Sequence, residues 1–307
     1  GPGMTRIVFF GTPDQALPAL DSLTKAFDVA LVVTQPDRPR GRSGRPMAPP
    51  VKTFSLGRGL AVAQPSNSSE IGEAVTSVGP LDLGVVVAYG RILRPAVLET
   101  PRHGILNLHF SLLPRWRGAA PVARALMAGD EMTGVTIIRL DEGLDTGPVL
   151  TAQAVDVRPD ENAGDLTSRL ARIGAALLVS VIPEYLSGEV VPVDQVDEGV
   201  AHAAKLEPED RRLGQDHDLA AFLGRVRGLA PVPGATLEID GEVHKILEAR
   251  LWGSAPPVGE WREQEGLPVV GVGGEGVALV ILQPPGRRPQ TGEEWLRGRH
   301  RPGGRVR

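Results

Sequence analysis

The first half of the chain alternates short, continuously apolar stretches with stretches whose apolar residues recur at helical spacing. The strand-like stretches are residues 6–11, 28–34, 81–89 and 105–109, and helix-like stretches lie between them at 14–25, 67–78 and 91–98. Strands that are apolar along their whole length and separated by helices indicate a parallel sheet covered on both faces. Further strands at 133–140 and 149–157 and an amphipathic helix at 163–185 follow. The sequence therefore predicts an N-terminal Rossmann-like α/β domain with a mostly parallel sheet.

The second half has a different pattern. Residues 183–208 mix Pro and Gly with polar residues, which is typical of a connection between domains. A helix at 215–226 and closely spaced strands at 235–239, 243–251, 269–272 and 277–282 follow, with a strong hairpin signal at Asp240-Gly241. This pattern favours a small, OB-like β-barrel. We expect a domain at 4–188, a linker at 189–208 and a C-terminal barrel at 209–307, with residues 1–3 as the remnant of a cleaved tag.

Length and composition narrow the classes of protein. A chain of 307 residues suits two domains better than one core. The sequence has no Cys, which excludes disulfides, thiolate metal sites and cysteine nucleophiles. No apolar run reaches the ~20 residues of a membrane span, and no signal pattern follows Met4. The six His show no metal-ligand spacing. We expect a cytoplasmic protein without a metal or a membrane partner.

The net charge of −4 conceals two basic segments. Between Asp37 and Arg58 six basic residues stand against one acid, and from Arg287 to Arg307 seven Arg stand against two Glu. Two basic patches on an acidic chain suit a phosphate-bearing partner held in a defined orientation. The alternative interpretation is a solvated loop and a frayed C-terminal tail.

Polar residues stand at the end of one predicted strand, where ligands bind in open α/β sheets. Asn107 and His109 are two apart and therefore share a face, and polar residues entering such a core are costly unless they are used. Asp145 lies in a loop after a later strand. The alternatives are satisfied core polar groups for the first two and a common Asp-Gly turn for the third. The first strand-helix turn, Gly11 to Asp14, lacks the Gly-x-Gly-x-x-Gly phosphate-binding pattern.

The order of these motifs is specific. Asn107-x-His109, then Ser-Leu-Leu-Pro-x-x-Arg-Gly from Ser111, then Asp145-Thr-Gly resemble the folate-dependent formyltransferase family. The resemblance implies 10-formyltetrahydrofolate as co-substrate and Asn107, His109 and Asp145 as catalytic residues. It also implies a folate pocket formed by Ser111, Leu112, Leu113, Pro114, Tyr89 and Gly90.

Within that family, the chain is most similar to members that formylate the initiator methionyl-tRNA. Residues 34–42 resemble the inserted loop by which those members contact the tRNA acceptor end, and a second domain follows. The resemblance implies tRNA contacts at Arg38, Arg42 and Arg45, in a protein expected to be a monomer. Two departures are Ser43-Gly44-Arg45, where lysines are common, and Phe110, where a small residue is usual.

Three other functions remain open at this point. The acceptor could be another amine, such as glycinamide ribonucleotide or an amino-sugar nucleotide, which the basic loop and second domain disfavour. A nicotinamide-dependent oxidoreductase is disfavoured by the missing glycine pattern. A non-catalytic RNA-binding protein would use the barrel as an oligonucleotide platform, and the three intact catalytic positions disfavour it.

Overall fold

The computed structural model describes residues 3–39, 41–214 and 216–307. Gly1 and Pro2 of the expected tag remnant, Arg40 of the basic loop and Gln215, the expected start of a helix, lie outside the described residues. Contacts divide the chain into two compact units. Unit 1 comprises Gly1–Gly118, Gly134–Val155 and Thr167–His202, and unit 2 comprises Ala119–Thr133, Asp156–Leu166 and Ala203–Arg307. The domain boundaries expected from the sequence stay a prediction.

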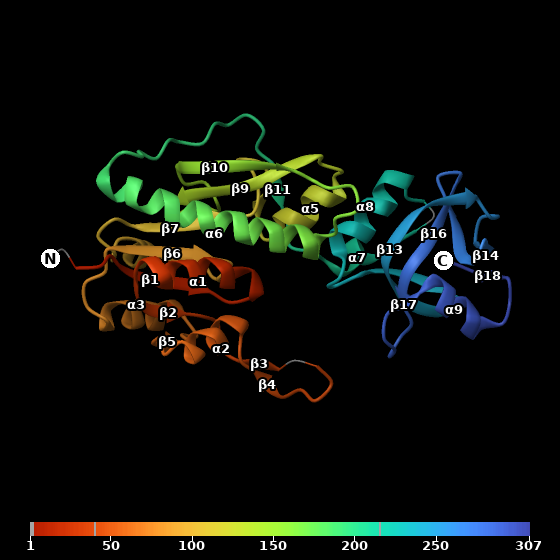
Figure 1. Cartoon of the computed structure of the whole chain (residues 1–307), viewed down its shortest axis with the longest axis horizontal. Coiled ribbons are helices and arrows are strands. Elements are labelled where there is room, and N and C mark those ends of the chain that lie inside the picture. The colour runs from red at the N-terminus through yellow and green to blue at the C-terminus, as the bar shows by residue number, and fades with distance from the viewer. Residues whose placement is uncertain (1–2, 40, 215) are drawn as a thin grey trace. The chain divides into compact units, whose positions relative to one another are not determined.

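Unit 1 is built on a seven-stranded sheet (Figure 1). Its strands, in order across the sheet, are β10 (Val149–Asp156), β9 (Met132–Arg139), β7 (Ile105–His109), β6 (Leu83–Val87), β1 (Arg6–Gly11), β2 (Asp28–Val33) and β5 (Val62–Ala63). The five strands from β7 to β5 pair in parallel, and β9 runs antiparallel to β7. The predicted Rossmann-like, mostly parallel sheet is confirmed.

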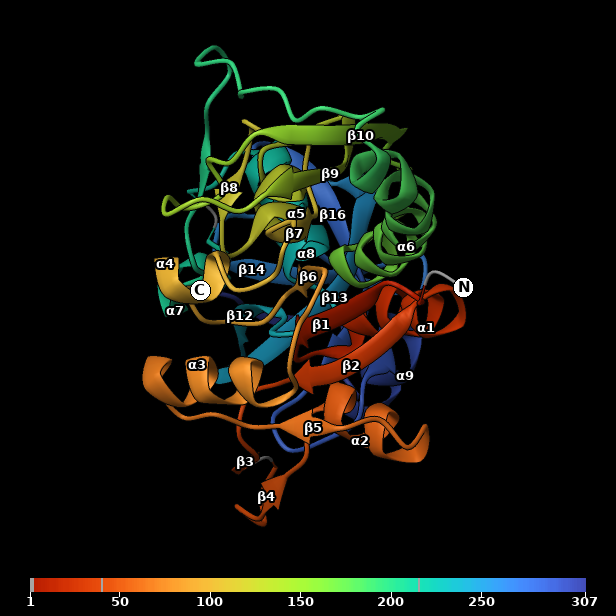
Figure 2. The same cartoon turned by 90° about the vertical axis from the view of Figure 1, so that its left-hand side faces the viewer.

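Helices cover both faces of this sheet. They are η1 (Asp14–Ala16), α1 (Leu17–Ala26), α2 (Pro50–Gly57), α3 (Ser68–Ser77), α4 (Pro95–Leu98) and α6 (Ala163–Ser187). Figure 2 shows α1 and α6 on one face and α3 and α4 on the other. On the α3 face, Ile71 and Val75 pack with Val8 and Val33 of the strands. Two short pairs complete the unit: β3 (Arg38–Pro39) with β4 (Pro46–Met47), and β8 (Arg117–Gly118) with β11 (His202–Ala203).

The long helix α6 has the length and apolar composition of a membrane span. Its apolar side, however, includes Leu170, Leu178 and Ile182, which are fully buried in the protein. A side chain at Gly174 would collide with Leu108 of β7, so the helix lies directly on the sheet. Burial of this kind is what a core helix of an α/β fold requires.

The described residues of unit 2 form an antiparallel barrel and four helices. The strand order is β12 (Ala235–Ile239), β13 (Glu242–Ser254), β16 (Glu275–Gln283), β15 (Leu267–Val272), β14 (Glu260–Gln264) and β18 (Gly303–Arg305), and β17 (Gln290–Thr291) pairs with β16. A bridge between Ile239 and Val306 brings the two edges of the curled sheet together. The helices are α5 (Pro121–Met127), α7 (Pro208–Arg211), α8 (Leu219–Leu229) and α9 (Gly292–Arg299). The predicted OB-like barrel is confirmed, with Trp261, Phe222 and Trp295 in its core.

Several local expectations need correction. The predicted helix at 91–98 contains only Pro95–Leu98. The predicted helix at 14–25 begins with a 3₁₀ turn at Asp14–Ala16, and the preceding Thr12 Oγ1 donates to the Tyr89 carbonyl at 2.9 Å. The frayed-tail alternative is wrong for the described residues, because the tail forms α9 and β18.

Candidate active site

Asn107 and His109 lie on β7, between β6 and β9. Their backbones pair across the sheet, Asn107 with Ile138 and His109 with Thr136. Although both are polar, they are only 8% and 6% exposed. Since their side chains share one face of a buried strand, the structure brings them together as the sequence predicted.

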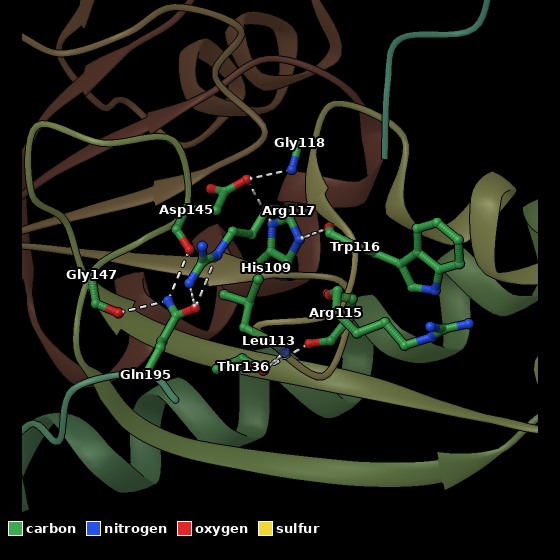
Figure 3. Close-up of polar contacts among 11 residues, drawn as sticks. His109, Leu113, Arg115, Trp116, Arg117, Gly118, Thr136, Asp145, Gly147 and Gln195 are labelled. Atoms are coloured by element: carbon green, nitrogen blue, oxygen red, sulfur yellow. Dashed lines mark hydrogen bonds and ion pairs between the residues drawn. The ribbon is translucent and has the colours of Figure 1, made fainter. Parts of the chain in front are cut away.

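Both ring nitrogens of His109 face acceptors (Figure 3). Nε2 lies 2.8 Å from the carbonyl oxygen of Trp116, and a carbonyl can only accept, so Nε2 carries the hydrogen and donates. Nδ1 lies 3.6 Å from Oδ2 of Asp145. A carboxylate and a carbonyl on opposite sides of the ring hold it in one plane and present an acceptor to each ring nitrogen.

Asp145 reaches His109 from a loop that folds back along the sheet. The register pairs Arg139, at the end of β9, with Leu106, near the start of β7, so the topology alone leaves the loop away from His109. Residues 140–148 close the gap: Asp141 Oδ1 accepts from Gly143 N at 2.9 Å and from Thr146 Oγ1 at 2.7 Å. The predicted Asp-Gly turn is therefore present, and it serves to project Asp145.

The Asp145 backbone and carboxylate are both held. Its φ is 55°, a left-handed conformation that costs a residue other than glycine about 1–3 kcal/mol. Oδ2 accepts from the backbone N–H of Gly118 at 2.8 Å, and the side chain is 13% exposed. This hydrogen bond places Oδ2 between the Gly118 amide and the His109 ring, as Figure 3 shows.

Sequence reasoning missed Gln195. Its Nε2 donates to the carbonyls of Asp145 and Gly147, each at 2.8 Å, and its Oε1 accepts from Arg117 Nη2 at 2.7 Å. No periodicity or motif marks this residue, because it lies in the segment expected to be a linker. Its partner Arg117 lies in the Arg-Gly that ends the Ser-Leu-Leu-Pro motif, but the motif does not identify the residue that Arg117 binds.

The predicted folate residues after β7 form a loop anchored on β9. Thr136 Oγ1 donates to the Ser111 carbonyl at 2.7 Å and accepts from Leu113 N at 3.1 Å. Ser111 is fully buried, and its hydroxyl donates to the Arg115 carbonyl at 2.6 Å. Leu112, Leu113 and Pro114 remain half-buried. The loop thus presents an apolar surface next to His109 and uses the Ser111 hydroxyl internally.

Tyr89 and Gly90 follow the neighbouring strand β6. The Tyr89 ring is 1% exposed and meets Phe10 edge to face. Its hydroxyl has no hydrogen-bond partner among the described residues, and burial raises the pKa of Tyr89 to about 12. The Tyr89 carbonyl accepts from Thr12 and from Gln35. Gly90 is exposed at φ 93°. A folate contact at these positions stays a prediction, and it would involve backbone atoms rather than the Tyr89 ring.

The predicted tRNA residues lie on the β3/β4 hairpin. Arg38, Arg42 and Arg45 are exposed. Two other cations of the same basic segment are paired: Lys52 lies 3.0 Å from Asp37, and Arg58 lies 3.2 Å from Asp21. Hydrogen bonds from Gln64 and Lys52 hold the pKa of Asp37 below its usual range. Positive charge that can meet an external anion is therefore concentrated on the hairpin arginines.

The site contains an amide, an imidazole and a carboxylate around one strand end. Such a set can donate to a developing oxyanion and move a proton, which suits acyl transfer without a covalent enzyme intermediate. Within residues 3–39, 41–214 and 216–307, no group of three or more His, Asp or Glu is placed to hold a metal ion.

Comparison with known proteins agrees with this chemistry. The model of the family described as formyl transferase matches residues 5–182, and that described as formyl transferase, C-terminal domain, matches residues 205–300. The crystal structure of WlaRD, a sugar 3N-formyl transferase solved in the presence of dTDP and 5-N-formyl-THF, superposes with a TM-score of 0.65 at 16% identity. That superposition covers 93% of this chain and 99% of the other, and it supports the fold.

Sequence relatives match nearly end to end. A methionyl-tRNA formyltransferase of Halorhodospira halophila is 48% identical over 304 residues, covering 96% of each chain. One of Chloroflexus aggregans is 42% identical and covers 97% of this chain and 98% of its own. The chain therefore belongs to the formyl transferase family, in the group of the methionyl-tRNA formyltransferases.

Proposed function

We propose that this protein transfers the formyl group of 10-formyltetrahydrofolate to the amino group of initiator methionyl-tRNA, giving formylmethionyl-tRNA for translation initiation. The observation that supports this most is the convergence of Asn107, His109 and Asp145 at one strand end in a chain related over its whole length to methionyl-tRNA formyltransferases. We propose that the protein acts in the cytoplasm and that it is a monomer.

The nucleophile needs little activation. A free α-amino group has a pKa of ~7.7–8.0, and esterification of the amino acid lowers it further, so much of the amine is neutral at working pH. It attacks the formyl carbon directly, forming a tetrahedral intermediate with an oxyanion. The intermediate then loses the folate nitrogen, which leaves with a proton.

Asn107 supplies the oxyanion donor in this proposal. Its position on β7, which is buried along its whole length, restricts where the side chain can move. One fixed donor of this kind contributes roughly 100- to 1,000-fold in rate. An amide is suited to the task because it donates without changing its charge.

His109 and Asp145 transfer the proton of the attacking amine in this proposal. With Asp145 Oδ2 at 3.6 Å, the ring can become an imidazolium without leaving a buried charge unpaired. Nε2 is bonded to the Trp116 carbonyl, so it has to leave that carbonyl to donate to a bound substrate. The amine proton can reach Asp145 through His109 or through a water, and the folate nitrogen receives a proton in return.

Folate would lie on the loop after β7. Leu112, Leu113 and Pro114 are half-buried and held in place through Thr136, so their apolar surface exists before a pterin ring arrives. A preformed apolar surface with few polar groups is typical of small-molecule sites. Gly90, which follows the neighbouring strand β6, adds no side chain there.

The acceptor stem of the tRNA would contact the β3/β4 hairpin. Arg38, Arg42 and Arg45 are exposed, whereas Lys52 and Arg58 are engaged with Asp37 and Asp21. Contacts to phosphates position a nucleic acid without reading its sequence. The hairpin would therefore set the orientation of the acceptor end.

The test is release of deformylated folate. Wild-type protein with 10-formyltetrahydrofolate is mixed with methionyl-tRNA, with the same tRNA uncharged, or with N-acetylmethionyl-tRNA, whose amine is blocked. The proposal expects release with the first acceptor alone. Release with all three acceptors, or with none, contradicts it.

A further inference from the structure

Gln195 joins two parts of the site through one amide group. Its Nε2 donates to the Asp145 and Gly147 carbonyls, and its Oε1 accepts from the Arg117 guanidinium at 2.7 Å from Nη2 and 3.2 Å from Nε. Arg117 directly precedes Gly118, whose N–H binds the Asp145 carboxylate. We infer that Gln195 is a positioning residue that fixes Asp145 against His109, an inference that rests on the function proposed above.

The segment around Gln195 is placed by the sheet. Val193 forms an antiparallel bridge with Val149, the first residue of β10, with backbone hydrogen bonds of 2.7 and 2.9 Å. The residues on either side of Gln195, Asp194 and Val196, are exposed, whereas Gln195 is half-buried and turned inward. Apolar burial does not explain an inward amide, because its burial costs free energy unless its hydrogen bonds are made. The hydrogen bonds themselves hold Gln195 there.

Asp145 needs such support. Its left-handed φ of 55° and its place in a long loop give it no hydrogen bonds of a helix or strand. Gln195 donates hydrogen bonds to the backbone on both sides of Thr146, at the carbonyls of Asp145 and Gly147. The Asp145 carboxylate separately accepts a hydrogen bond from Gly118 N. Because Gln195 also binds Arg117, its amide links the loop to the β8 segment that carries Gly118.

The hydrogen-bond directions are fixed by the partners. Two carbonyl oxygens can only accept and a guanidinium can only donate, so the amide has one allowed orientation, as Figure 3 shows. A carboxylate at this position would retain Arg117 but would set an acceptor against two carbonyls. Substitution by Glu therefore separates the contact with Arg117 from the contacts with the two carbonyls.

The experiment compares steady-state formylation of methionyl-tRNA by wild type, Gln195→Met, Gln195→Glu and Gln153→Ala. Met keeps the volume without the amide, and Gln153, exposed on β10, is the matched control. Thermal unfolding of each protein checks the fold. We expect both Gln195 variants to lower kcat by about 10- to 100-fold, since a displacement of an ångström can cost that much. KM for folate and for tRNA should stay within about twofold, and Gln153→Ala should match wild type.

The Glu variant decides between positioning and mere structure. If Gln195 only braced Arg117, Glu would form an ion pair and restore kcat relative to Met. That result, or wild-type kcat in Gln195→Met, or raised KM with unchanged kcat, would overturn the inference. If the wild-type protein forms no formylmethionyl-tRNA, the proposed function fails instead, which the same data distinguish.

Discussion

Replacing Asp145 by Asn removes the charge beside His109 while changing the structure least. Asn retains an oxygen that can accept from Gly118 N, the bond that Asp145 Oδ2 makes at 2.8 Å. Asn also tolerates the φ of 55°, because Asn and Asp enter the left-handed region more readily than other side chains. The variant should therefore fold with the same loop geometry.

The expected magnitudes differ between folding and rate. The Gly118 bond changes from a charged to a neutral acceptor on a side chain that is 13% exposed, which costs roughly 1 kcal/mol of unfolding free energy. In the reaction, His109 loses the negative charge beside its ring. Proton transfer by a positioned group contributes about 100- to 10,000-fold, so we expect the rate of formyl transfer to fall by that factor.

Single-turnover formylation measures the chemical step, with formylmethionyl-tRNA separated from methionyl-tRNA. Denaturant unfolding on the same preparations measures stability. A folded Asp145→Asn protein that forms product at a near-wild-type rate would refute the assignment of Asp145. Loss of rate together with several kcal/mol of stability would show that the carboxylate acts through folding instead.

Three further outcomes are expected. Gly147→Ala should lower kcat at least about tenfold in steady-state assays, because the added methyl would overlap the Arg139 carbonyl and displace the Asp145 loop; unchanged kcat would contradict the close packing. Arg42→Ala and Arg45→Ala should each reduce the salt slope of tRNA binding by about one, whereas Arg58→Ala, whose cation is paired with Asp21, should not. Burial lowers the pKa of His244, whose Nε2 accepts from Trp295 and lies 3.0 Å from Arg299 Nη2. Its stabilising contribution is therefore complete above about pH 6.5 and is lost as the pH falls toward the lowered value. Denaturant unfolding at several pH values should show this loss in wild type and less of it in His244→Gln; equal slopes would contradict it.

The sequence predicted best where pattern and local chemistry coincide. Strand β7 has the predicted bounds, because its residues are apolar apart from Asn107 and His109. The hairpin turn predicted at Asp240-Gly241 is also confirmed. Its φ values of 50° and 82° are those that Asp-Gly favours, and β12 and β13 pair around it.

Elements with weak periodicity were missed. Helices α2 and α5 are short and begin with Pro50 and Pro121, so the Pro signals resembled loops rather than the first turn of a helix. Strand β14 is mostly polar and has one buried anchor, Trp261. The tail looked frayed from its charge, yet Arg301 lies 2.6 Å from Asp240 and fixes it to the barrel.

Candidate site residues can be named from the sequence as far as motifs extend along the chain. Asn107, His109 and Asp145 could be singled out from residue type, spacing and resemblance. Their support could not, because Gln195 lies 50 residues from Asp145 in sequence and meets it only through the folded loop. Long-range side-chain contacts to the backbone leave no periodic signal.

The identity of the acceptor is the central element of the proposed function. The decisive measurement is formyl transfer from 10-formyltetrahydrofolate offered methionyl-tRNA of the initiator type, glycinamide ribonucleotide and an amino-sugar nucleotide in parallel. Formylation of the methionyl-tRNA alone is the predicted result. Turnover on either small amine, with none on methionyl-tRNA, would leave the proposed catalytic residues in place but contradict the role given to the arginine hairpin.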